Sequence, residues 1–133
     1  FELQNVADDT WNLDGCTVTD GESTSTLSAA DMPGSNVFVF ARNTNVAANG
    51  GVTAEGAFTL TLTANDSLTL QCGATVIDTV TWTTVTEGAT LSLDPDHYSA
   101  AQNDLAANYC LGSAPYGDGG DFGTPHAGNS QCP

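Results

Sequence analysis

Basic residues are almost absent from this sequence, which has sixteen Asp and Glu residues and one basic residue, Arg42. The formal net charge of the 133 residues is −15. Nucleic acids and anionic membrane surfaces are both bound through clustered Lys and Arg. The composition therefore argues against either as a partner. It leaves three interpretations of the acidity: a soluble surface, adaptation to a salty medium, or carboxylates that bind a divalent cation.

Long hydrophobic segments are also absent. No run approaches the roughly 18 apolar residues of a transmembrane helix, so we expect no membrane insertion. The chain does not open with a basic segment followed by an apolar one, as a signal peptide would. It opens instead in a strand-like pattern, FEL, and we expect a mature or excised part of a longer precursor.

Catalytic signatures are missing as well. The sequence contains no GxSxG elbow, HExxH pair, phosphate loop or dinucleotide fingerprint. Its only histidines are His97, which follows a Pro-Asp turn, and His126, which lies in a Gly-rich tail. We expect both on the surface, and we expect no enzymatic activity and no obligatory cofactor.

The four cysteines form an even set without the spacing of metal ligands. Disulfides are therefore expected, and they imply an oxidising, extracellular or cell-surface location. Sequence alone leaves three connectivities open. We favour Cys16–Cys72, which would join two strands, and Cys110–Cys132, which would close the tail.

The apolar pattern is that of β-strands. Residues 58–82 show alternating apolar and polar positions broken by turn residues, which predicts a meander of three strands over 58–63, 68–72 and 76–82. The run VFVFA at 37–41 predicts a strand buried on both faces. Residues 1–4, 11–20, 26–28 and 89–93 are further predicted strands, and 97–109 is the candidate helix. We expect one domain, with a sandwich over 1–109 and a Gly/Pro-rich tail over 110–133 held by its disulfide and turns.

Oxygen-rich turns suggest a possible calcium site. Asp94 and Asp96 flank a proline, and Asp118 and Asp121 flank two glycines. Such carboxylates suit Ca²⁺, although neither turn follows the EF-hand pattern. The alternative is that each Asp accepts hydrogen bonds from its own turn.

Two further residues are candidate surface sites. Asn65 opens the glycosylation sequon Asn-Asp-Ser on a predicted hairpin turn. Trp11 lies between polar residues and is expected to be partly exposed, as a possible binding residue. Trp82 and at least one of Phe38 and Phe40 are expected in the core, because each lies on an alternating strand.

Taken in order, these motifs resemble the lamin tail domain family in its secreted prokaryotic branch, over nearly the whole chain. Cys16 stands where that family usually has an aromatic residue. The similar segments are FELQN at 1–5 to "(W)xELxN", LDGCTVTD at 13–20 to "LxGWxLxD", PG at 33–34 with VFVFAR at 37–42 to "PGxxxVLAR", NDSLTL at 65–70 to "xxDxLxL", VIDTVTW at 76–82 to "xVVDxVxY", and GTP at 123–125 near Asn129 to "GTPGxxN".

The resemblance implies an immunoglobulin-like β-sandwich, in agreement with the many short predicted strands. Family members usually open with one more apolar strand, of the type "VxINEI", which this chain lacks. A sandwich without an edge strand exposes backbone and core. The resemblance therefore implies a truncated sandwich, a strand donated by a neighbouring chain, or another segment that fills the gap.

From these patterns we expect a non-enzymatic, extracellular structural or adhesive module that acts through protein–protein contacts. Self-association into a filament, with a neighbour's strand completing each sandwich, is the form we favour. The alternative is an accessory domain of a larger secreted protein that binds a polysaccharide or another ligand through Trp11. A calcium-dependent adhesin is a third hypothesis, which removal of metal by EDTA would test.

Overall fold

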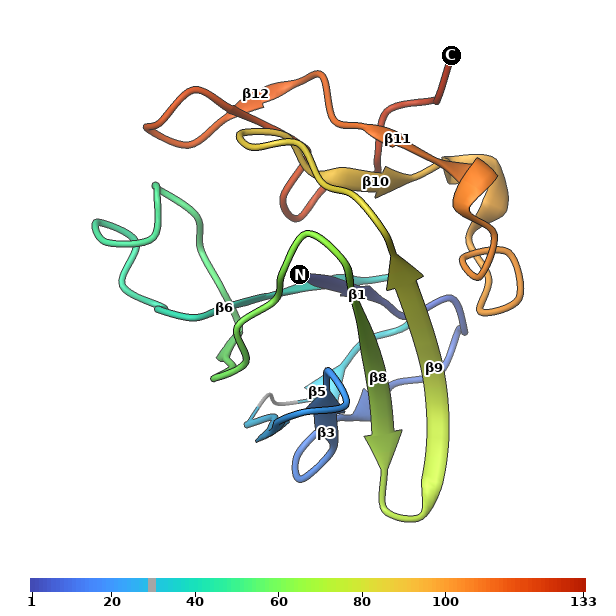
Figure 1. Ribbon diagram of the computed structural model, residues 1–133. Helices are drawn as coiled ribbons and strands as arrows, with labels where there is room; N and C mark the ends of the chain where they lie inside the picture. Colours follow the sequence, from blue (N-terminus) through green and yellow to red (C-terminus); the bar gives the residue numbers. More distant parts are fainter. Residues whose placement is uncertain (29–30) are drawn as a thin grey trace.

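The computed structural model describes residues 1–28 and 31–133, and it shows an all-β chain with two disulfides (Figure 1). The expected fold class is confirmed, and the arrangement of sheets around one core is consistent with a β-sandwich. The strands are β1 (Glu2–Gln4), β2 (Trp11–Asn12), β3 (Thr17–Thr19), β4 (Thr24–Thr26), β5 (Asp31–Met32), β6 (Val37–Ala41), β7 (Gly56–Ala57), β8 (Asp66–Cys72), β9 (Thr75–Trp82), β10 (Leu91–Leu93), β11 (Tyr109–Leu111), β12 (Pro115–Tyr116) and β13 (Asp121–Phe122).

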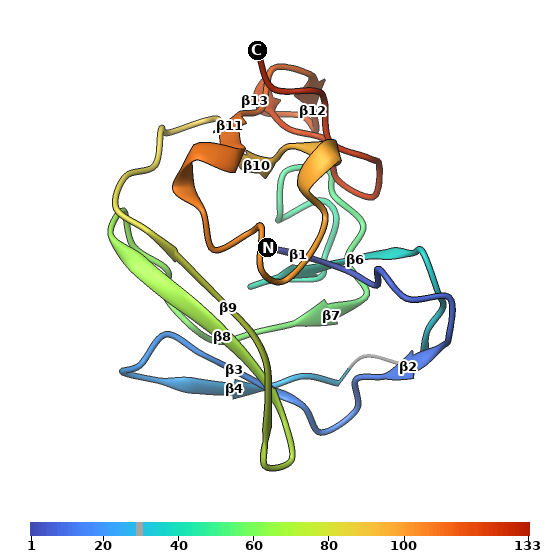
Figure 2. The same cartoon turned by 90° about the vertical axis from the view of Figure 1, so that its right-hand side faces the viewer.

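Two sheets carry most of the pairing. The larger has the order β4-β3-β8-β9 and is antiparallel throughout, and the smaller has the order β1-β6-β7. Within the smaller sheet β6 pairs antiparallel with β1 and parallel with β7. Three two-stranded pairs complete the fold: β2 with β5, β10 with β11, and β12 with β13. Figure 2 shows the last two pairs gathered at one end of the molecule, beyond β1.

The core lies between these sheets. Its most deeply buried side chains are Phe40, Leu27, Leu60 and Val18, none more than 1% exposed. The Cys16–Cys72 disulfide joins the neighbouring strands β3 and β8 at their ends within the larger sheet, and the Cys16 side chain belongs to the buried cluster. Both predicted disulfides are therefore confirmed.

The strand predicted over residues 37–41 is confirmed with the same bounds. Consecutive residues of a strand point to opposite faces. Val39 and Phe40 are consecutive and both buried, so β6 is covered on both faces. The ring of Phe40 stacks on that of Phe1, with centroids 5.2 Å apart.

Two of the three meander strands are confirmed as the β8–β9 hairpin, but the strand predicted over residues 58–63 is wrong. Phe58 and Leu60 are buried as the alternation requires, at 6% and 1% exposed. The backbone nevertheless forms no ladder there. The Thr59 amide donates to the Ser25 hydroxyl at 3.0 Å, so a side chain takes the place of a neighbouring strand.

The helix predicted over residues 97–109 is also wrong, because the described backbone has only the 3-10 turns η1 (Pro95–His97) and η2 (Ala106–Asn108) near it. Polar side chains bond the backbone in the intervening loop. Asn108 donates to the Gln102 carbonyl at 2.7 Å, and the Ser99 hydroxyl accepts from the Gln102 amide at 3.3 Å. Such local bonds compete with helix formation, and short helices are marginal in any case.

Two further predicted elements differ in extent. The strand expected over residues 11–20 is divided into β2 and β3 by a turn in which Gly15 has a φ of +77° and the Cys16 amide donates to the Leu13 carbonyl at 3.0 Å. The tail was predicted to lack a ladder. It contains the small β12–β13 pair, and its first residues form part of β11, which pairs with β10.

Candidate functional site

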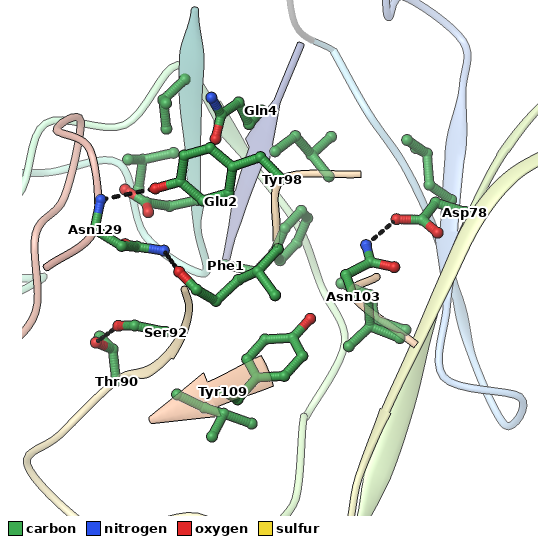
Figure 3. A pocket seen from close by; sticks show the side chains of 18 of the residues that line it. Phe1, Glu2, Gln4, Asp78, Thr90, Ser92, Tyr98, Asn103, Tyr109 and Asn129 are labelled. Carbon is green, nitrogen blue, oxygen red and sulfur yellow. Dashed lines mark hydrogen bonds between the residues drawn. The ribbon is translucent and has the colours of Figure 1, made fainter. Parts of the chain in front are cut away.

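A groove of about 800 Å³ lies beside β1 (Figure 3). Its lining is mostly apolar and comes from strands far apart in the sequence. Leu3 on β1, Leu68 on β8, Ile77 and Val80 on β9, and Leu91 on β10 all contribute. Ligand sites in proteins are commonly of this volume and character.

The groove exists because several apolar side chains contact the core on one side and are left uncovered on the other. Leu3, Leu68 and Ile77 are partly buried against the core cluster. At the rim, Val6 is 62% exposed and Trp11 is 47% exposed. A connected apolar surface of this kind on a soluble domain usually marks an interaction site.

Polar groups gather at one wall of the groove, where β9 faces the loop between η1 and η2. Asn103 donates to a carboxylate oxygen of Asp78 at 2.5 Å. The other amide atom of Asn103, Oδ1, is buried without a hydrogen-bond partner among the described residues. Buried polar atoms are nearly always bonded, so this acceptor is an exception within the polar wall.

Tyr109 stands close to this pair. Burial, followed by the negative charges of Asp78 and Asp104, raises the pKa of its phenol to about 12. The hydroxyl therefore stays protonated at neutral pH and can donate a hydrogen bond toward the groove.

Asn129 fixes the tail along another wall. Its amide N–H donates to the Tyr98 hydroxyl at 2.9 Å, and its side chain donates to the Leu93 carbonyl at 2.8 Å. Its Oδ1 accepts from the Thr124 hydroxyl at 2.9 Å. These bonds occupy the polar groups of Asn129 and hold the tail in place. Asn129 therefore helps to form the wall of the groove.

Asp94, a predicted calcium ligand, has a similar structural role. Its side chain is buried, at 8% exposed, and accepts from the Asp96 amide at 2.9 Å, as the turn interpretation expects. It also accepts from the Gln131 side chain at 2.9 Å and from the Cys132 amide at 3.2 Å. Asp94 thus connects β10 to the disulfide-closed end of the tail.

The remaining calcium candidates are not brought together. No group of three or more His, Cys, Asp or Glu side chains close enough to hold a metal is found within residues 1–28 and 31–133. Asp96 bonds to Gln131 at 3.0 Å, Asp118 lies against Gly51, and Asp121 lies near Gly88. The calcium hypothesis therefore gains no geometric support from these four residues.

The predicted exposure of Trp11 is confirmed, and Phe40 is in the core as expected. Trp82 differs from the prediction because its indole is only half-buried. Its Nε1 donates to the Thr63 carbonyl at 2.8 Å, which places the ring along the groove and outside the buried core. Asn65 is exposed beside β8, as a glycosylation acceptor requires.

The predicted surface position is confirmed for His126, which is exposed, but not for His97. His97 is half-buried in η1. The ring of His126 contacts the Thr53 carbonyl at 2.8 Å and lies 3.6 Å from a Glu55 oxygen, and its backbone amide donates to Glu2 at 2.8 Å. His126 therefore joins the tail to the edge of the β1-β6-β7 sheet.

Glu2 gives a pH-dependent prediction. Glu2 keeps an exposed surface, but partial desolvation by neighbouring atoms, with a smaller contribution from the Glu55 charge, raises the pKa of this carboxyl despite the bond from the His126 amide. The folded state then holds the Glu2 proton more tightly than the unfolded state, so the stability that Glu2 contributes falls as pH rises through its folded pKa. We expect Glu2→Gln to raise the urea midpoint at pH 7 and to have no effect below about pH 3, where Glu is protonated in both states.

Glu22→Gln is the matched control, because Glu22 lies in an exposed loop. It should leave the midpoint nearly unchanged at both pH values. A lower midpoint for Glu2→Gln at pH 7 would contradict the account, since it would mean that the negative charge itself stabilises the fold.

Sequence reasoning missed the groove and its polar wall. Asn103, Tyr98 and Tyr109 all fall in the segment predicted as a helix, and no local pattern indicated that they would face β9 and β10.

Neither 3-10 turn of the described chain is long or apolar enough to cross a membrane. Comparisons with protein-family models, with curated proteins and with solved structures found no match to this chain.

Proposed function

We propose that this chain is a non-enzymatic, extracellular structural or adhesive module that acts through protein–protein contacts at the groove beside β1. The observation that supports this proposal is the groove itself, an apolar hollow of about 800 Å³ that the described residues leave unfilled. Two disulfides support the extracellular location, because such bonds persist in oxidising compartments. The acidic surface keeps an uncomplexed module soluble.

The alternative of a polysaccharide-binding accessory domain depends on Trp11. This ring is 47% exposed, but it lies at the rim of the groove, where a protein contact would cover it. Retention on immobilised polysaccharide that disappears in Trp11→Ala would favour this alternative over a protein partner.

The proposal is tested by the native mass and shape of the protein from its source, measured by light scattering and negative-stain imaging. We expect a defined complex or a polymer with a regular repeat. A monodisperse monomer of its own polypeptide mass would contradict the proposal.

A matched pair of surface variants locates the contact. Val6 lines the groove and is 62% exposed, and Val76 on β9 lies outside it at 57% exposed. Val6→Lys should weaken the association, because it places a charge in the apolar contact. Val76→Lys carries the same change of charge and should associate as the unmodified chain does. Equal effects from the two variants would show that the groove is not the contact.

A further inference from the structure

The edge of β1 that faces away from β6 has no strand beside it among the described residues. The Phe40 amide donates to the Phe1 carbonyl at 2.9 Å, and the Phe1 amino group donates to the Phe40 carbonyl at 3.0 Å. The Asn5 amide donates to the Asn36 carbonyl at 2.9 Å. Bonded and non-bonded positions alternate in an antiparallel pair. The N–H and C=O groups of Glu2 and Gln4 therefore point away from β6, along the groove that both residues line.

The opposite side of the groove has a second open edge, on β10. Thr90 accepts from the Gly112 amide at 2.9 Å and Asp94 donates to the Asn108 carbonyl at 2.8 Å, so the even-numbered positions bond on the β11 side. The backbone groups of Leu91 and Leu93 then point the other way. The Leu93 carbonyl is taken by Asn129, and no described strand pairs with this edge.

These two edges have compatible directions. In both ribbon views, β1 and β10 run in the same general direction (Figures 1 and 2), and residues of both strands line the groove. One strand placed between them can lie antiparallel to both, which is the more stable pairing. It would join the β1-β6-β7 sheet to the β10–β11 pair and remove two exposed edges at once.

The groove floor also has the character that a strand requires. Leu68 on β8 and Ile77 and Val80 on β9 present partly open apolar surface below the two edges. The side chains of a strand alternate between its two faces. Every second residue of the inserted strand would cover this floor, and the residues between them would face solvent.

The charge distribution constrains the partner. The chain carries a net charge of −15, and the carboxylates of Glu2 and Asp78 border the groove. A strand with Lys or Arg at its polar positions complements this negative charge, whereas a second copy of this sequence, with its single basic residue, would be repelled.

We propose that the groove accepts one extended β-strand from a different, neighbouring chain, antiparallel to β1 and β10, with apolar residues at alternate positions and basic residues between them. This inference rests on the proposed function and specifies its partner. Backbone bonds to the two edges supply affinity, and the apolar floor selects the alternating side chains, as in other cases of strand addition.

The first test uses the synthetic peptide acetyl-VKVTVKVTV-amide as the probe. We expect it to slow amide exchange at Glu2, Gln4, Leu91 and Leu93 while Leu3 and Ser92, which already bond to neighbouring strands, stay unchanged. An isomer of the same composition without alternation should not bind. An analogue N-methylated at a central residue should bind about tenfold more weakly, through the loss of one to two net backbone bonds. Equal binding of the N-methylated analogue would overturn the proposal and indicate a pocket for apolar ligands.

A variant of the protein provides the second test. Gln4→Pro removes the N–H that points away from β6, and an edge strand tolerates proline at such a position. We expect about tenfold weaker peptide binding with an unchanged circular dichroism spectrum, and Gln4→Ala should bind normally. Normal binding by a folded Gln4→Pro variant would overturn the role of this edge.

The outcomes separate this inference from the proposed function. A native assembly in which the peptide protects none of the four amides would sink the strand mechanism and leave the protein-contact function standing. A native monomer would contradict the proposed function even if the peptide binds. A groove filled by a strand of the protein's own polypeptide would overturn the assignment to a neighbouring chain.

Discussion

Replacing the buried disulfide, in the double variant Cys16→Ala/Cys72→Ala, is expected to lower the free energy of unfolding by about 4 kcal/mol. The bond closes a loop with a sequence separation of 56, and on the chain-entropy model longer loops gain more from closure. Cys16 is also only 4% exposed within the core cluster, so its replacement loses packing as well. Urea unfolding measured at fixed ionic strength gives the value.

The second disulfide is the natural control. Cys110–Cys132 closes a shorter loop, with a separation of 22, at the periphery of the fold. The double variant Cys110→Ala/Cys132→Ala should lower the free energy of unfolding by about 3 kcal/mol on the same model. A larger loss for this pair than for Cys16–Cys72 would show that the bond in the tail, and not the bond between β3 and β8, dominates stability.

Phe40→Ala is expected to lower the free energy of unfolding by about 3–5 kcal/mol, as truncations of buried Phe typically do. Phe40 is 1% exposed in the middle of β6, and its ring stacks on Phe1 at the start of β1. Loss of this ring removes packing from the face of the smaller sheet that contacts the core. It should also loosen β1, which provides one edge of the groove.

Phe122→Ala is the matched control, because Phe122 is 43% exposed on β13. It should change the urea midpoint little. Similar losses from the two variants would contradict the assignment of the core to the space between the two main sheets.

The sequence predicted the fold wherever local pattern and covalent chemistry coincide. The alternation and β-branched content of residues 66–82 suit a hairpin, and the apolar run at Val37–Ala41 suits a strand covered on both faces. Both of these strand predictions depend on short-range information. The favoured Cys16–Cys72 pairing is confirmed, but it joins residues 56 apart, and the sequence alone left three connectivities open.

The failures have tertiary causes. The alternation at residues 58–63 correctly predicted burial, but a strand also needs a partner backbone, and the Ser25 hydroxyl occupies that position. Trp82 alternates like a core residue, yet it ends beside an unfilled groove. The bond between Asn103 and Asp78 joins residues 25 apart, and no local pattern announces it.

The central claim is that a neighbouring chain's strand completes the fold, and the most direct measurement is a cryo-electron microscopy map of the protein in its native assembly. The account predicts continuous density for one extended segment between β1 and β10, antiparallel to both and traceable to another polypeptide. An empty groove, or density that traces back to the same polypeptide, would contradict it.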